Sequence, residues 1–213
     1  MTGTHGSGDH LGVLATSVNA LEMVTYAGDI VRITRGHPAF EGMVVGLGAF
    51  GVVTRLSLDI LPSFSMRQDV FEGLSWDAVL ADLEAIMAAG YSVCLLTMWS
   101  APTIMLLWIK SRLEDGPPAV AAWNVSPAGQ SALTADPAVM ATLYPFNGEP
   151  GPWSERLPHF RHDRPLPVPD QLQSEYFLPR YRVIEALRAL RTIGDRLDPH
   201  LVITEIRSMA GDT

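Results

Sequence analysis

The chain has 213 residues, of which 47% are hydrophobic and 18% charged, a composition typical of a folded globular protein rather than a disordered one. Its 15 basic and 23 acidic residues give a net charge of −8, which argues against nucleic-acid binding through the phosphate backbone. The single cysteine, Cys94, excludes an internal disulfide and a multi-cysteine zinc site, and its apolar neighbours predict a buried thiol. No apolar run is long enough for a membrane span and no secretory signal pattern is visible, so a cytoplasmic protein is expected.

Strand and helix signals follow one another in the first part of the chain. Apolar side chains dominate 21–26 and 30–34, and the glycine-containing turn between these runs predicts a β-hairpin. Pro38 precedes apolar residues at helical spacing, which predicts a short helix. Residues 52–60 alternate apolar and polar side chains and are expected to form a half-buried strand. Pro62 ends this pattern, so a domain boundary is expected there.

The second domain, residues 63–213, is expected to contain a sheet covered by helices. Ser75 is a suitable N-cap for an apolar-faced helix that ends at Gly90, and 183–193 has the same amphipathic pattern. The segment 116–169 is rich in Pro, Gly and Ala and is expected to pack through its aromatic side chains. Strands without regular β-α-β alternation indicate an α+β fold with largely antiparallel sheets. Strands are expected at 66–72, 92–98, 103–111, 172–178 and 201–207.

A glycine-rich loop near the start of the chain is the first candidate site. Gly6 and Gly8 allow close backbone approach to a ligand, and Ser7 adds a hydroxyl donor. The loop has neither the lysine of a P-loop nor the spacing of a dinucleotide fingerprint, and a plain flexible loop is the alternative. His5 and His10 lack a third partner at metal-ligand spacing, so no metal site is predicted.

Polar side chains on two of the expected strands form the second candidate site. Glu205 and Arg207 alternate with apolar neighbours, so they are expected on one face of a buried strand, where carboxylate and guanidinium can pair. Gln173 and Glu175 form a similar set on another strand. Together these groups could line a polyol pocket, because guanidinium and carboxylate groups suit the binding of hydroxyls. A purely structural ion pair is the alternative.

Several stretches, taken in order along the chain, resemble the alditol (xylitol) oxidases of the vanillyl-alcohol-oxidase flavoprotein superfamily. The glycine-rich stretches are general to the superfamily, whereas the middle and C-terminal stretches are specific to alditol oxidases. The similar stretches are TGTHGSG at 2–8, GLGAFGVVT at 46–54, GPWSERLPHFR at 151–161, LQSEYFLPR at 172–180 and Glu205-Ile206-Arg207.

The resemblance implies that residues 1–62 are the C-terminal part of a PCMH-type FAD-binding domain and that 63–213 form a substrate (cap) domain. It implies an FAD-dependent oxidoreductase that oxidises a CH–OH group of an alditol such as xylitol or sorbitol, with oxygen as acceptor, to an aldose and hydrogen peroxide. Arg207 and Glu205 match catalytic side chains, and Ser7 and Gln173 join them as matches to polyol-binding residues. The positions that match flavin-contacting residues are Gly6, Ser7, Gly8, Gly12, Ala15, Thr16, Ser17, Val18 and Val53.

The resemblance also has gaps. The family's phosphate-binding loop and flavin-linking histidine have no counterpart in the chain, and His5 does not match that histidine. We therefore expect a fragment, incomplete at both ends, that by itself neither holds FAD tightly nor oxidises xylitol. Two alternatives stay open: a sugar-1,4-lactone oxidase of the arabinono- or gulonolactone type in the same superfamily, and a truncated product without catalysis. The sequence does not define the oligomeric state.

Overall fold

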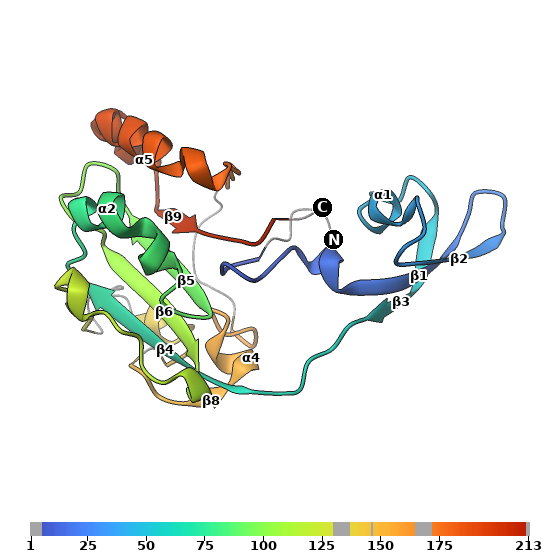
Figure 1. Ribbon diagram of the computed structural model, residues 1–213, viewed down its shortest axis with the longest axis horizontal. Helices are drawn as coiled ribbons and strands as arrows, with labels where there is room; N and C mark the ends of the chain where they lie inside the picture. The colour runs from blue at the N-terminus through green and yellow to red at the C-terminus, as the bar shows by residue number, and fades with distance from the viewer. Residues whose placement is uncertain (1–5, 130–136, 146, 165–171, 212–213) are drawn as a thin grey trace. The chain divides into compact units, whose positions relative to one another are not determined.

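The chain divides into two units, each with its own antiparallel sheet (Figure 1). One unit comprises Met1–Ser63 with Ser208–Thr213, and the other comprises Phe64–Arg207. Mixed helices and antiparallel strands confirm the expected α+β class. The computed structural model describes residues 6–129, 137–145, 147–164 and 172–211.

The first unit is built on a three-stranded sheet in the order β2-β1-β3. β1 (Val18–Val24) pairs antiparallel with β2 (Ile30–Thr34) through the predicted hairpin, and with β3 (Val52–Leu58) along its other edge. The short helix α1 (Phe40–Val44) closes a small apolar core against β1 and β2. The buried side chains of this core are Val18, Leu21, Met23, Ile33, Phe40 and Val44.

β3 forms where the sequence predicts a strand, but the predicted half-burial is wrong. All seven of its residues are exposed. β3 pairs with the rest of the sheet only through β1, and the buried core of this unit contains none of its side chains. Alternation along a sequence marks a strand that has two chemically different faces. One face becomes buried only if other residues pack against it, and the alternation does not predict such packing.

The second unit contains a six-stranded sheet whose main path runs β7-β4-β6-β5-β9, with β8 paired to β4. All of its strand pairs are antiparallel. In this order β6 is the middle strand, with the long strands β4 and β5 on either side and shorter strands outside them. The strands are β4 (Ser65–Glu72), β5 (Ser92–Thr97), β6 (Leu106–Arg112), β7 (Ser126–Pro127), β8 (Gly151–Pro152) and β9 (Thr204–Arg207).

One face of this sheet is covered by the two long helices, α2 (Trp76–Met87) and α5 (Val183–Thr192), as Figure 1 shows. The N-cap prediction is confirmed, because the Ser75 hydroxyl oxygen accepts a hydrogen bond from the Ala78 amide at 3.1 Å. The helix ends at Met87, and its C-cap is Ala88 rather than the predicted Gly90. Alternate strand residues such as Leu107 face these helices and are fully buried.

Polar contacts fix α5 and the turn after it to the loop between β5 and β6. Arg191 donates hydrogen bonds to the carbonyl oxygens of Trp99 and Ala101 at 2.8 and 2.7 Å. Asp198 accepts hydrogen bonds from the backbone amides of Trp99 and Ser100, both at 2.8 Å. These contacts provide hydrogen-bond partners for backbone groups of the loop.

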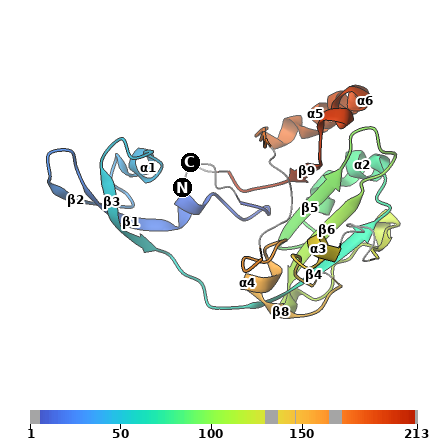
Figure 2. The ribbon, with the colours of Figure 1, turned by 180° about the vertical axis from the view of Figure 1, so that it is seen from behind.

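The opposite face of the sheet is covered by irregular chain that follows β7 and includes α4 (Trp153–Arg156), visible from behind in Figure 2. Trp108 and Cys94 are buried on this face with Leu143 from the covering chain. Trp123 and Tyr144 are buried, as the sequence predicts. Trp153 and Phe160 are 43% and 41% exposed, and Trp153 stacks on Phe64 with the ring centroids 6.3 Å apart, whereas Phe146 lies outside the described residues. The other short elements are α3 (Pro137–Met140), α6 (Gly194–Leu197) and 3-10 turns at Leu14–Ser17, Leu113–Asp115, Ala121–Trp123, Arg180–Arg182 and Asp198–His200.

The strand predicted at 172–178 is wrong. Residues 172–178 have no strand hydrogen bonding, and every one of them is exposed. Leu172 and Tyr176 have side chains almost fully open to solvent. A run of alternating residues becomes a strand only when it pairs with another strand, and no strand of the described sheets pairs with 172–178.

Replacement of Leu107 by Ala should destabilise the second unit by about 3 kcal/mol, because it leaves a cavity at the centre of the helix-covered core. Urea unfolding followed by tryptophan fluorescence measures the effect. The matched control is Leu113→Ala, at a leucine that is 44% exposed. Equal stabilities of the two variants would contradict the assignment of this core.

Candidate functional site

Glu205 and Arg207 lie on β9, the outer strand of the six-stranded sheet, and their side chains contact each other as the sequence predicts. The predicted burial of this strand is wrong. The Glu205 and Arg207 side chains are 33% and 29% exposed. β9 pairs with β5 along one edge only, so one side of the strand stays open. The pair is therefore accessible to a ligand.

Strand register shows which face carries this pair. Arg207 is directly opposite Cys94 on β5, and Cys94 is opposite Trp108 on β6. Residues directly opposite each other in antiparallel strands project from the same face. Glu205 and Arg207 are thus on the face covered by irregular chain, and the helix-covered face plays no part in this site.

Cys94 is the buried neighbour of Arg207. Burial raises the pKa of its thiol, and the charge and hydrogen bond of Arg207 oppose that shift. The thiol is therefore in its protonated form at neutral pH. Its role next to Arg207 is that of a neutral hydrogen-bonding group.

Lys110 on β6 is the second cation on this face and is only 4% exposed. Its ammonium group donates a hydrogen bond to the carbonyl oxygen of Leu157, in the chain that covers the sheet. Burial lowers the pKa of Lys110 to about 7, with an added lowering from Arg207 and an opposing effect from Cys94. Lys110 therefore changes charge in the neutral pH range, unlike an exposed lysine.

His159 covers the middle of this face. Its ring stacks on Trp108, with the ring centroids 4.4 Å apart. Burial lowers the pKa of His159 well below its usual value, and the positive charges of Lys110 and Arg207 lower it further. The imidazole is therefore neutral at physiological pH. Trp108 is itself held by a hydrogen bond, which its indole N–H donates to Gln68 Oε1 at 3.0 Å.

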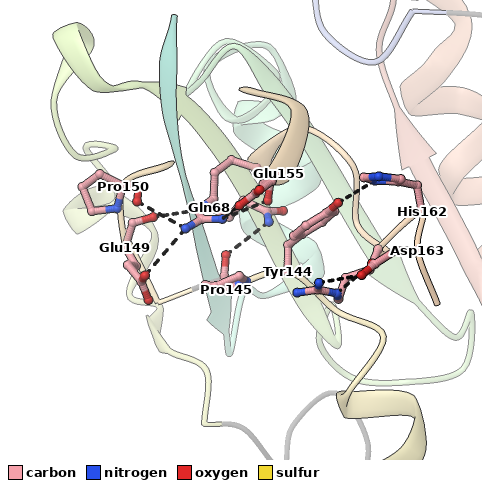
Figure 3. A network of polar contacts seen from close by, with 10 residues as sticks. Gln68, Tyr144, Pro145, Glu149, Pro150, Glu155, His162 and Asp163 are labelled. Carbon is pink, nitrogen blue, oxygen red and sulfur yellow. Dashed lines mark hydrogen bonds and ion pairs between the residues drawn. The ribbon is translucent and has the colours of Figure 1, made fainter. Parts of the chain in front are cut away.

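Further polar contacts hold the covering chain in place, and Figure 3 shows them. Gln68 donates to the carbonyl oxygen of Pro145 at 3.2 Å, and the Tyr144 hydroxyl contacts His162 Nδ1 at 2.8 Å. The buried Arg156 donates to the carbonyl oxygens of Glu149 and Pro150 at 2.9 and 3.2 Å. Its guanidinium also leaves no room for a side chain at Gly151, where an added Cβ would lie 2.5 Å from Cζ. These contacts hold the covering chain in a defined conformation.

The predicted flavin loop lies in the first unit and is joined to the end of the chain. The Gly8 amide donates to the Ser208 carbonyl at 2.8 Å, and the Ala210 amide donates to the Leu11 carbonyl at 3.0 Å. At Gly6 an added Cβ would lie 1.7 Å from the Leu11 carbonyl oxygen, so only glycine fits this turn. Ser7 is half-buried within the same loop.

The other predicted flavin contacts follow this loop. Ala15, Thr16 and Ser17 form the 3-10 turn Leu14–Ser17, and an added Cβ at Gly12 would meet the Thr16 hydroxyl at 3.0 Å. Val18 is fully buried in the core of the unit, so only its backbone could face a cofactor. Val53 lies on the exposed strand β3.

A buried hydroxyl beside the glycine loop fits a bound group there. Among the described residues, the Ser208 and Thr25 hydroxyls are buried without a hydrogen-bond partner. An unpaired buried hydroxyl is costly, and native structures usually supply a partner. Ser208 accepts the Gly8 hydrogen bond through its backbone, so its hydroxyl adjoins the loop that the sequence assigns to flavin. The residues present are compatible with a cofactor at this loop.

Of the predicted substrate residues, the structure brings Glu205 and Arg207 into contact. Gln173 instead donates to Glu175 at 2.7 Å within the exposed segment 172–178. Sequence reasoning missed Lys110 and His159 as neighbours of Arg207. One signal was available, because Lys110 is the single lysine of the chain and stands within an apolar strand. The position of His159 depends on an irregular segment that no sequence pattern defines.

Two kinds of feature are absent from the described residues. No group of three or more His, Cys, Asp or Glu side chains there is arranged to hold a metal ion. No helix among them has the length and apolar character required to span a membrane.

The Cys94 thiol should react much more slowly with Ellman's reagent at pH 8 in the folded protein than in urea, because it is buried and its pKa is raised. Cys94 is the single cysteine, so one absorbance trace reports on this position alone. Equal rates in the folded and unfolded protein would show that this face of the sheet is open around Cys94.

Comparison with known proteins agrees with the resemblance drawn from the sequence. The chain is 41% identical over 211 residues to an alditol oxidase of a Streptomyces species, a match that covers 99% of the chain and 50% of that relative. It is 33% identical over 85 residues to an L-gulonolactone oxidase of Scyliorhinus torazame, covering 39% of the chain and 19% of the relative. The chain spans half the length of the first relative and a smaller part of the second.

No family model matches the sequence. Among solved structures, cholesterol oxidase of B. sterolicum is similar at a TM-score of 0.43 and 18% identity, covering 55% of this chain and 24% of that one. The predicted resemblance is confirmed: nearly the whole chain is similar in sequence to half of an alditol oxidase.

Proposed function

We propose that this chain forms part of an FAD-dependent oxidoreductase that oxidises a CH–OH group of an alditol, such as xylitol or sorbitol. Oxygen is the acceptor, and the products are an aldose and hydrogen peroxide. The observation that carries the proposal is the Glu205–Arg207 pair, accessible on one face of the sheet, in a chain 41% identical to an alditol oxidase. The pair offers both hydrogen-bond donors and acceptors to a polyol.

Arg207 and Glu205 have different roles in the proposed reaction. Loss of the hydroxyl proton to water would place negative charge on the carbinol oxygen, and the fixed guanidinium of Arg207 would stabilise that charge until the hydride leaves the carbon and the carbonyl forms. Glu205 holds Arg207 through their contact and accepts hydrogen bonds from neighbouring hydroxyls. Ser7 and Gln173 are further proposed hydroxyl-binding residues.

The first unit would hold the cofactor. We assign residues 1–62 to the C-terminal part of a PCMH-type FAD-binding domain and 63–213 to the substrate domain. Gly6, Ser7 and Gly8 would approach the flavin through their backbone, followed by Gly12, the turn Ala15–Ser17, and the backbone of Val18 and Val53. The unpaired Ser208 hydroxyl beside Gly8 supports this placement. When bound, the flavin supplies the hydride acceptor.

A sugar-1,4-lactone oxidase is the second candidate and is less well supported. The lactone-oxidase relatives match only 39% and 40% of the chain, against 99% for the alditol oxidase. Both candidates share the proposed cofactor and differ in substrate. A panel of alditols and aldonolactones, tested on the full-length protein, separates them by the substrate that gives hydrogen peroxide.

Replacement of Arg207 by Ala in the full-length protein should lower kcat for xylitol by about 100-fold or more, because a preorganised cation is lost. Flavin content, measured from the absorbance near 450 nm, should be unchanged. The matched control is Arg188→Ala, at an exposed arginine on α5, and it should leave kcat unchanged. Unchanged turnover in the Arg207 variant would reject the assigned role.

A further inference from the structure

Arg35 links the strands of the first unit at one end of their sheet. It directly follows β2, and its amide donates a hydrogen bond to the Asn19 carbonyl oxygen at 2.8 Å. Its side chain forms an ion pair with Asp59, the residue that directly follows β3, with Nη2 and Oδ2 2.7 Å apart. Since β1 lies between β2 and β3, Arg35 connects the ends of both outer strands past the start of the central one.

The same guanidinium binds the chain where it enters β1. Arg35 Nη2 donates to the carbonyl oxygens of Thr16 and Val18 at 3.0 and 2.8 Å. The carbonyl oxygen of the residue between them, Ser17, accepts a hydrogen bond from the Asp59 amide at 2.8 Å. Three successive carbonyl groups of this segment are therefore bound by Arg35 and its ion-pair partner.

These carbonyl groups belong to the 3-10 turn Leu14–Ser17 and to the first residue of β1. Inside the turn, the hydroxyl and the amide of Thr16 both donate to the Val13 carbonyl oxygen, at 2.7 and 3.0 Å. Those bonds fix the turn internally, whereas Arg35 and Asp59 fix it to the sheet. Residues 15–17 of this turn are among those proposed above to approach the flavin.

A surface ion pair is the simpler explanation of the contact between Arg35 and Asp59. Their side chains are 47% and 51% exposed, and exposed ion pairs add little to the free energy of folding. The two hydrogen bonds to backbone carbonyl groups set Arg35 apart from such a pair. Arg55 on β3 offers the comparison, because it is 74% exposed and lies 3.6 Å from the Glu22 carboxylate of the same sheet.

We propose that Arg35 is a positioning residue for the cofactor, which holds the turn Leu14–Ser17 in the conformation that contacts the flavin. The inference rests on the proposed function for the placement of flavin at this turn. A guanidinium suits the task, because its planar group presents several donors in a fixed arrangement. A turn that is fixed before the cofactor arrives loses less conformational entropy on binding. Arg35 therefore strengthens flavin binding without touching the flavin.

Hydrogen–deuterium exchange of the 213-residue chain tests the positioning step without any cofactor. In Arg35→Ala the peptide that spans the turn should exchange about tenfold faster, because two of its carbonyl groups lose a charged donor. Exchange in the β1–β2 hairpin should stay as in the wild type. The matched control, Arg55→Ala, should leave exchange at the turn unchanged. Asp59→Asn removes only the counter-charge of Arg35 and should give a smaller increase at the same peptide.

Unchanged exchange at the turn in Arg35→Ala would overturn the proposal. Equally faster exchange throughout the first unit would also overturn it, because Arg35 would then have a general structural role.

Titration of the flavin-free, full-length protein with FAD tests the functional step. The Kd of the folded fraction, followed by quenching of flavin fluorescence, should rise about tenfold in Arg35→Ala and stay unchanged in Arg55→Ala. A merely structural role would reduce the amount of folded protein and leave this Kd unchanged, and that result would overturn the proposal. Failure of the proposed function looks different. The wild-type full-length protein would then bind no flavin, while exchange at the turn would still depend on Arg35.

Discussion

Alternation of side chains along antiparallel strands decides which residues of the second unit can act together. Every second residue of β4, β6, β5 and β9 faces the helices α2 and α5, and the residues between them face irregular chain. Glu205 and Arg207 fall in the second set. A shift of β9 by one residue would turn both toward the helices, so the register of β9 against β5 is the constraint on which the candidate site depends.

The irregular chain that covers this face is held by buried polar groups rather than by regular structure. Arg156 donates to carbonyl oxygens of the segment before it, Lys110 donates to Leu157, and His159 stacks on Trp108. The hydrogen bonds satisfy backbone carbonyl groups, and the stacking covers the His159 ring. These residues lie within or against the stretch 151–161.

Periodicity was enough to predict the hairpin, the helices with their Ser75 cap, and the strand that carries Glu205 and Arg207, because these elements depend on local patterns. It failed where burial depends on distant chain. β3 and β9 are edge strands and more open than their sequences suggest, and 172–178 pairs with no strand among the described residues. Lys110 and His159 were missed as neighbours of Arg207 because strand register and an irregular segment bring them together.

The central claim is that the face of the sheet bearing Glu205 and Arg207 receives the polyol. A crystal structure of the flavin-loaded, full-length protein soaked with xylitol tests it most directly. The account predicts electron density for the polyol with hydroxyls hydrogen-bonded to both Glu205 and Arg207. Polyol density elsewhere, with this pair in contact only with each other, would contradict the claim and leave the pair with a structural role.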